Sequence, residues 1–331
     1  MGNEINVETP AKQVSFASNH AVLLQLIPPY FKRVYGLRQV FKSADAETVL
    51  KYETSFTYKK TVADDRRLFE IDRVSQVYIN DTLPESVADQ LALQTGAVFY
   101  PLQVLVNFKG EFISVANPED LRERWKSTKE SILDYFVGED VIHYLEVTES
   151  VIADQHQLNE VISKDLVIRT FFAGIYCSYK NDEGILTELN FPLTGQAAPW
   201  QFSVKQIVSP VYNPDGQIEI RHEGVSIDDR CIGDMIREDD YATMRFEDET
   251  IPKVEAGYKA RYALNAITKS IEALEVSWNM KLQQEEIISI SMYEISGADK
   301  QSEEQLAKDS VQKEKHEQAA GVSGFIKKLF G

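Results

Sequence analysis

The chain has 331 residues, is 43% hydrophobic and carries a formal net charge of −17. Its length suits one large domain or two ordinary ones. The acidic balance argues against a nucleic-acid-binding protein, which needs a basic face, and against attachment to an anionic membrane surface. Because no run of about 18 apolar residues occurs, we expect no transmembrane segment.

The N-terminal sequence and the cysteines bear on location. The first residues are polar and lack the apolar stretch of a secretory signal, and Asn6 stands where a myristoylation motif needs Ser or Thr. The two cysteines, Cys177 and Cys231, are far apart in the sequence. One disulfide is possible, but two reduced thiols are the better interpretation. We therefore expect a cytoplasmic protein.

The first third of the chain combines strands with a short helix. Residues 1–20 are predicted to be a flexible arm. Residues 21–31 are apolar but broken by Pro28-Pro29, so we expect them to pack on the body or, alternatively, to bind a partner. Alternation of apolar residues predicts strands, and Pro84 opens a helix. These elements are the strands 48–58 and 67–79 and the helix from 84 to about 96.

The clearest local pattern is a hairpin followed by a helix, over residues 98–136. Apolar residues alternate from Leu102 to Phe108, and Gly110 allows the turn into the returning strand 112–115. Asn117 and the proline after it are typical of a helix start. The helix then carries one apolar stripe, which predicts packing against a sheet. The stripe consists of Leu121, Trp125, Ile132 and Phe136.

The remaining body is predicted to be helical at first and then mostly β. The helical period continues through 139–163, so residues 117–163 form a helical block. Short turns between successive strands then favour an antiparallel sheet. The expected strands are 166–179, 185–193, 202–211, 218–221, 258–264, 268–280 and 288–294. The predicted class is α+β: a long curved antiparallel sheet, a helical block that covers its concave face, and a disordered C-terminal tail.

The predicted organisation has one continuous body and two C-terminal pieces. A mixed α/β region, 21–165, and a β-rich region, 166–297, make up the body, and a polar linker follows over 298–320. Residues 321–331 form a short amphipathic peptide, with four apolar side chains on one helical face and two lysines opposite. We expect this peptide to bind a protein partner. Its predicted contact residues are Phe325, Ile326, Lys327, Lys328, Leu329 and Phe330.

Motifs that carry known chemistry are missing from the sequence. It contains no P-loop, no G-x-G-x-x-G after a strand, no H-E-x-x-H, no C-x-x-C and no G-x-S-x-G. We therefore expect no cofactor, and the balance leans against an enzyme.

One polar constellation, His222 to Asp240, keeps a chemical alternative open. Its carboxylates could hold a hard cation such as Ca²⁺ or Mg²⁺, or could work with His222 as the acid and base of a hydrolase. The spacing does not match an EF-hand, so an exposed acidic loop is the favoured interpretation. The candidate metal ligands are Asp228, Asp229, Asp234, Asp239 and Asp240.

The leading hypothesis is a non-enzymatic cytoplasmic adaptor, chaperone-like or part of a larger assembly, that docks a protein partner through its C-terminal peptide. The first alternative is a carrier of an apolar small molecule or lipid, because strands rich in Tyr and Phe could line a cavity in a curved sheet. The second alternative is the hydrolase or metal site between His222 and Asp240.

Overall fold

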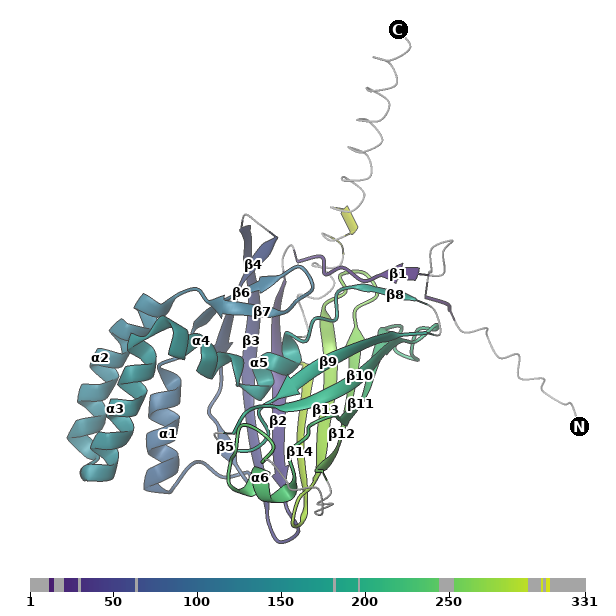
Figure 1. The fold of residues 1–331 in the computed structure, drawn as a ribbon. Helices are drawn as coiled ribbons and strands as arrows, with labels where there is room; N and C mark the ends of the chain where they lie inside the picture. The colour runs from purple at the N-terminus through teal and green to yellow at the C-terminus, as the bar shows by residue number, and fades with distance from the viewer. Residues whose placement is uncertain are drawn as a thin grey trace, which may run out of the picture.

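A computed structural model describes residues 12–14, 21–28, 31–62, 65–180, 183–195, 197–243, 253–296, 305 and 308–309. Within these ranges, 12 strands form one antiparallel sheet (Figure 1). From edge to edge the main order is β7 (Phe112–Val115), β6 (Leu102–Asn107), β4 (Arg66–Arg73), β3 (Glu47–Val62), β2 (Lys32–Lys42), β14 (Glu285–Glu294), β13 (Ile271–Lys281), β12 (Glu255–Leu264), β11 (Ile218–Ser226), β10 (Trp200–Val208) and β9 (Ile185–Phe191). A further short strand, β5 (Tyr78–Ile79), pairs with β3, and a separate ribbon joins β1 (Ala21–Leu23) to β8 (Ser178–Lys180).

The α+β class is confirmed, but the sheet is not strongly curled and the helices cover it differently from the prediction. Helices α1 (Val87–Ala97), α2 (Pro118–Tyr135) and α3 (Glu139–Ala153) lie side by side beyond the β7 edge (Figure 1). Helix α4 (Gln155–Ser163) packs against β7 itself. The short helix α5 (Leu166–Phe171) lies against the sheet face, while α6 (Ile232–Ile236) follows the end of β11. The expected helical cover is therefore supplied mainly by α5.

Helix α5 corrects the prediction of a strand over residues 166–179. The segment is rich in β-branched and aromatic residues, yet its first turn is helical because Asp165 caps it: its Oδ1 accepts a hydrogen bond from Ile168 N at 2.8 Å. Phe171 then stacks on Phe56 with ring centroids 3.7 Å apart. Tertiary packing on the sheet decides the conformation here rather than intrinsic β propensity.

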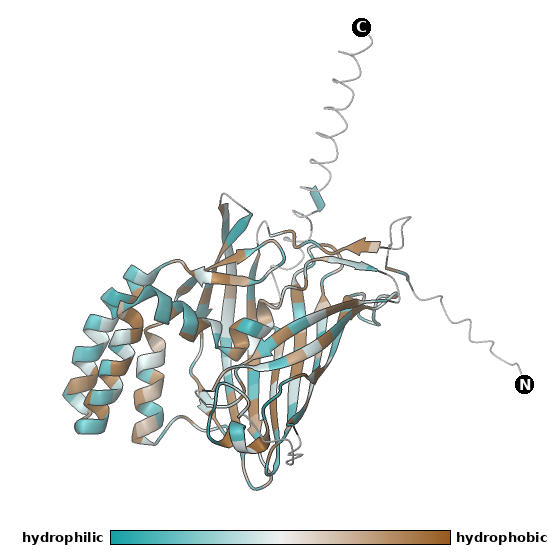
Figure 2. Ribbon diagram, viewed as in Figure 1, coloured by the Kyte–Doolittle hydropathy of each residue, from teal (hydrophilic) through white to brown (hydrophobic). Residues whose placement is uncertain are grey.

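Alternate residues of a strand point to the two faces of the sheet. Hydrophobic and hydrophilic residues alternate along strands of this sheet, as the bands of colour in Figure 2 show. The inner face, which packs against α5 and the segments around it, carries the core. Its aromatic cluster at β2 and β3 includes Tyr35 and Phe56, and a second cluster joins Phe191, Tyr258 and Trp278. These rings are buried, so the inner face is a packed core.

The stripe predicted for α2 is buried as expected: Trp125 is 3% exposed, and Leu121 and Ile132 are fully enclosed. Pro118 occupies the first turn, but Asn117 does not cap the helix with its side chain. Its Oδ1 accepts a hydrogen bond from Gln103 N instead, at 2.8 Å, and so ties the start of α2 to β6.

Strand β2, which the sequence patterns did not reveal, stands in the middle of the sheet. It pairs with β3 on one side and with β14 on the other, so it joins the two regions of the body. One polar residue of its inner face, Arg33, forms a buried ion pair with Glu294 at 2.9 Å. Tyr35 Oη donates to Ile271 O at 2.6 Å and ties β2 to β13.

The predicted linker 298–320 is described only at residues 305 and 308–309, which are helical. The predicted contact residues Phe325 to Phe330 and most of the N-terminal arm 1–20 lie outside the described residues. In the part of the chain that the structure describes, no helix is long and apolar enough to cross a membrane.

Candidate functional site

Small residues from neighbouring strands meet on the outer face of the sheet, the face opposite the core. The strand register places Ser277 of β13 directly opposite Ser289 of β14. Ser291 follows two positions along β14 and lies opposite Arg38, which brings Gly36 of β2 diagonally beside it. Gly257 of β12 is likewise diagonal to Ser277. These five positions carry glycine or serine, and together they form a path of short side chains across β12, β13, β14 and β2.

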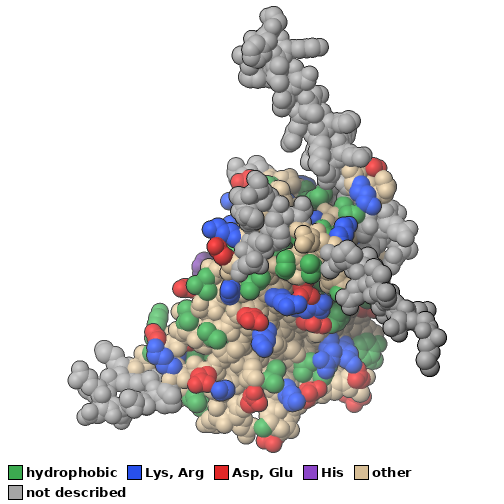
Figure 3. Space-filling model, turned by 90° about the vertical axis from the view of Figure 1, so that its right-hand side faces the viewer, with side chains coloured by type: hydrophobic (Ala, Val, Ile, Leu, Met, Phe, Trp, Pro, Cys, Tyr) green, Lys and Arg blue, Asp and Glu red, His purple; other side chains and the backbone are tan. Residues whose placement is uncertain are grey.

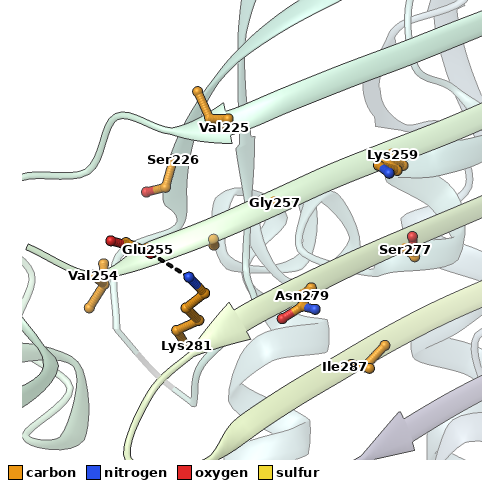
Figure 4. A pocket seen from close by; sticks show the side chains of 11 residues that line it. Val225, Ser226, Val254, Glu255, Gly257, Lys259, Ser277, Asn279, Lys281 and Ile287 are labelled. Carbon is orange, nitrogen blue, oxygen red and sulfur yellow. Dashed lines mark hydrogen bonds and ion pairs between the residues drawn. The ribbon is translucent and has the colours of Figure 1, made fainter.

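Three hollows lie along this path and share residues, and we call them together the outer groove. The first, of about 660 Å³, has Val225, Val254 and Ile287 among its walls (Figure 4). The second, of about 360 Å³, shares Lys259 and Ser277 with the first. The third, of about 560 Å³, shares Ser291 with the second and is lined by Gly36, Tyr293 and Ile295. Because they share residues in this way, the three hollows are neighbours in a row along the outer face.

Charged side chains stand along the outer groove and most of them are paired. At the first hollow, Lys281 Nζ lies 2.6 Å from Glu255 Oε2 (Figure 4). At the second, Arg261 contacts Glu219 at 2.8 Å and Glu275 at 3.7 Å. Burial opposes ionisation of Glu219, but hydrogen bonds from Arg261 and Arg221 outweigh it and lower the pKa of that carboxyl.

Lys259 differs from these charges. It stands where the first and second hollows meet, it is exposed, and among the described residues it forms no ion pair. On the face of the molecule that Figure 3 turns to the viewer, basic, acidic and hydrophobic side chains are interspersed among other side chains and backbone. The outer groove therefore has apolar side chains toward its two ends and mainly charged and polar ones between them, among which Lys259 forms no ion pair with a described residue.

His222 and the acidic loop, which the sequence grouped together, occupy different surroundings. His222 lies on β11 with its ring in the core, 1% exposed, and its Nδ1 is 3.3 Å from Tyr258 Oη. Burial penalises the charged imidazole and lowers its pKa to about 3, so the ring is neutral at neutral pH. A histidine enclosed in this way lacks the access to solvent and substrate that a general base needs.

The five candidate metal ligands each have a partner of their own. Asp228 holds Arg230 through two oxygens, at 2.9 and 2.7 Å, in a buried pair. Asp234 caps α6 by accepting from Cys231 N at 2.8 Å. Asp239 pairs with Arg237, Asp240 accepts a hydrogen bond from Ala198 N, and Asp229 pairs with Lys253. Within the described ranges, no group of three or more His, Cys, Asp or Glu side chains is arranged to hold a metal ion.

The space between the inner face of the sheet and α5 is too small for a lipid. The space found beside α5 amounts to about 10 Å³, enclosed by Phe31, Phe69, Phe171 and Phe172 among others. That volume is about what one water molecule needs. In this state the protein therefore holds no lipid-sized chamber at that point, and the large hollows described above open on the outer face instead.

The sequence matches no protein-family model and no curated protein. Among solved structures, the chain is similar to lipovitellin, in a structure titled for its lipid–protein interactions, with a TM-score of 0.38 and 10% identity. The match covers 80% of this chain and 25% of the lipovitellin chain, so this chain spans about a quarter of that protein's length. A similarity at this level says nothing about what this chain binds.

Sequence reasoning did not find the outer groove. Ser277, Ser289 and Ser291 alternate with buried apolar residues and were visible as the polar side of two strands. Their meeting depends on the pairing of β13 with β14 and of β14 with β2, which no local pattern specifies.

Proposed function

We propose that this protein is a non-enzymatic binding protein, an adaptor, and that its outer groove holds an elongated segment of a protein partner. The observation that carries the proposal is that three neighbouring hollows share lining residues and lie along a row of glycines and serines. A single hollow of 300–1,000 Å³ suits a small molecule. A series of three such hollows across several strands suits an extended polypeptide better.

The chemistry of the groove describes the segment that fits it. Gly257, Ser277 and Ser289 let the main chain of a bound segment approach the sheet closely. Apolar side chains of the segment would contact Val225 and Ile287 in the first hollow, and Tyr293 and Ile295 in the third. Lys259 in between would form a charge-assisted hydrogen bond with a carboxylate. We infer a segment with apolar residues toward both ends and an acidic residue between them.

The C-terminal peptide remains a second proposed docking element. Its apolar face, formed by Phe325, Ile326, Leu329 and Phe330, suits a groove on a partner in the helix-in-groove manner. Two separate docking elements on one chain are typical of an adaptor or an assembly chaperone. We also propose a cytoplasmic location, which the two free thiols of Cys177 and Cys231 support.

The test is a pull-down from native lysate with Ser289→Trp, which fills the middle of the groove with a large ring. Ser127→Trp, on the exposed side of α2, is the matched control because it adds the same ring elsewhere. We expect Ser289→Trp to lower partner recovery at least tenfold while Ser127→Trp recovers as much as the wild type. Equal recovery by both variants would exclude the outer groove as the docking surface.

A Phe325→Ala/Phe330→Ala variant separates the two docking elements. If the outer groove and the C-terminal peptide bind different partners, each variant loses its own set of proteins and keeps the other. If the peptide variant captures everything that the wild type captures, the peptide is not a docking element, whatever the groove does.

A further inference from the structure

A buried arginine without an acidic partner lies on the inner face of the sheet. Arg67 of β4 is 4% exposed. Its Nη2 donates to Leu26 O at 3.1 Å, and its Cζ lies 4.5 Å from the centre of the Phe108 ring. Its Nε and Nη1 are also buried, and among the described residues they have no hydrogen-bond partner.

No acidic side chain in the described part of the chain compensates the charge of Arg67. Burial lowers the pKa of Arg67, but a guanidinium stays protonated in proteins at neutral pH. In the described part of the chain Arg67 forms no ion pair, and the hydroxyls of Tyr176 and Tyr58 are the ionisable groups that act on it. Buried charges are normally paired, because an isolated one is strongly destabilising. The other buried arginines, Arg33 and Arg230, follow that rule with Glu294 and Asp228.

Arg67 is one of the residues that line the small space beside α5. Apart from Arg67, the residues that line it are aromatic, aliphatic or glycine. Gly110 closes one side, where any larger residue would strike the Tyr176 ring, since an added Cβ would lie 2.7 Å from it. The walls are Leu26, Phe31, Phe69, Val106, Gly110, Phe171, Phe172 and Tyr176. An apolar pocket that contains one cation is complementary to a ligand with one negative charge on a hydrocarbon body.

We propose that Arg67 binds the carboxylate of an aliphatic acid, of the fatty-acid class, and that the aromatic walls take its hydrocarbon chain. A hydrated inorganic anion would lose its water shell here for few donors, whereas a carboxylate on an apolar chain also removes apolar surface from water. The present space of about 10 Å³ holds no such chain, so Leu26 and the segment around it must move on binding. That segment is held by Leu24 N to Cys177 O at 3.0 Å and by Ile27 N to Thr268 O at 2.9 Å.

This site is independent of the outer groove. It gives the carrier alternative a different binding site: a closed pocket that opens when the ligand binds, in place of an open cavity in a curved sheet. The experiment is calorimetric titration of the full-length protein, stripped of bound lipid, with octanoate, acetate, chloride and octanol. We expect octanoate to bind at least tenfold more tightly than octanol, which lacks the charge, and than acetate, which lacks the chain. This comparison needs no variant, so it stands even if substitutions at Arg67 impair folding.

Arg67→Met then tests the residue, with Arg66→Met as the control that removes an equal charge from the exposed neighbour. Octanoate affinity should fall at least tenfold in Arg67→Met and stay unchanged in Arg66→Met. The proposal is overturned if octanoate does not bind, if octanol binds as tightly, or if acetate or chloride binds as tightly as octanoate. It is also overturned if folded Arg67→Met binds octanoate like the wild type.

Discussion

Replacing Phe171 by alanine tests whether α5 holds the inner face of the sheet. The ring is 6% exposed and stacks on Phe56 at 3.7 Å with an interplanar angle of 14°. It also meets Tyr35 and Phe172 edge-on, with centroids 5.5 and 5.2 Å away. A buried Phe→Ala change costs about 3–5 kcal/mol. Since three aromatic contacts are lost together, we expect the upper part of that range, about 4–5 kcal/mol.

Urea denaturation followed by circular dichroism and tryptophan fluorescence measures this loss. The expected cost corresponds to a melting temperature lower by about 10 °C for a domain of this size. Tyr135→Ala is the control, because that ring is 81% exposed on α2 and its loss should change the free energy of unfolding by no more than about 0.5 kcal/mol. If Phe171→Ala loses less than about 1 kcal/mol, the stacking on Phe56 does not stabilise the protein and this account of the core is wrong.

Four further predictions follow from the packing and the charges. Trp125→Ala should lower the free energy of unfolding by about 3–5 kcal/mol, and a melt like that of the wild type would show that the α2 stripe is not core. His222 takes up its proton near pH 3 when folded but near pH 6.5 when unfolded, so stability falls as the pH drops below about 6.5. Between pH 7 and pH 5 the wild type should therefore lose about 2 kcal/mol more than His222→Gln, and equal losses in urea melts would contradict the assigned burial. Asp228→Asn breaks the buried pair with Arg230 and should cost about 3–5 kcal/mol, whereas Asp229→Asn, at an exposed pair, should cost less than about 1 kcal/mol; similar costs would refute the distinction. Ending the chain after Gly297 should leave the melting temperature within about 5 °C of the full-length value, and a larger drop would show that residues 298–331 stabilise the body.

The sequence patterns were most informative where one face of an element is apolar. The hairpin of β6 and β7, the stripe of α2 and the strands β9 to β14 follow alternation or a 3.6-residue period, and both kinds of pattern report local burial. The amphipathic C-terminal peptide was equally visible, although its contact residues lie outside the described part of the chain.

The sequence patterns missed or misassigned elements whose burial depends on residues far away in the sequence. Strand β2 carries Arg33 and Gln39 among the residues of its inner face, and Arg33 becomes acceptable there only because Glu294 arrives from 261 positions away. Helix α5 looked like a strand because the segment is rich in β-branched and aromatic residues, although the capping Asp165 was a readable signal of a helix start. The pocket at Arg67 and the outer groove both depend on which strands become neighbours.

The pairing of β2 with β14 has a consequence for the newly synthesised chain. The last residue of β2 is Lys42 and the first of β14 is Glu285, so 285 − 42 = 243 positions separate them. At about 5–20 residues per second, the ribosome needs roughly 12–50 s to bring β14 out after β2. During that time one side of an 11-residue strand has no neighbour in the sheet. Strand β2, which lies in the centre of the finished sheet, is thus an open edge in the nascent chain. Its unpaired backbone groups can then pair with other chains.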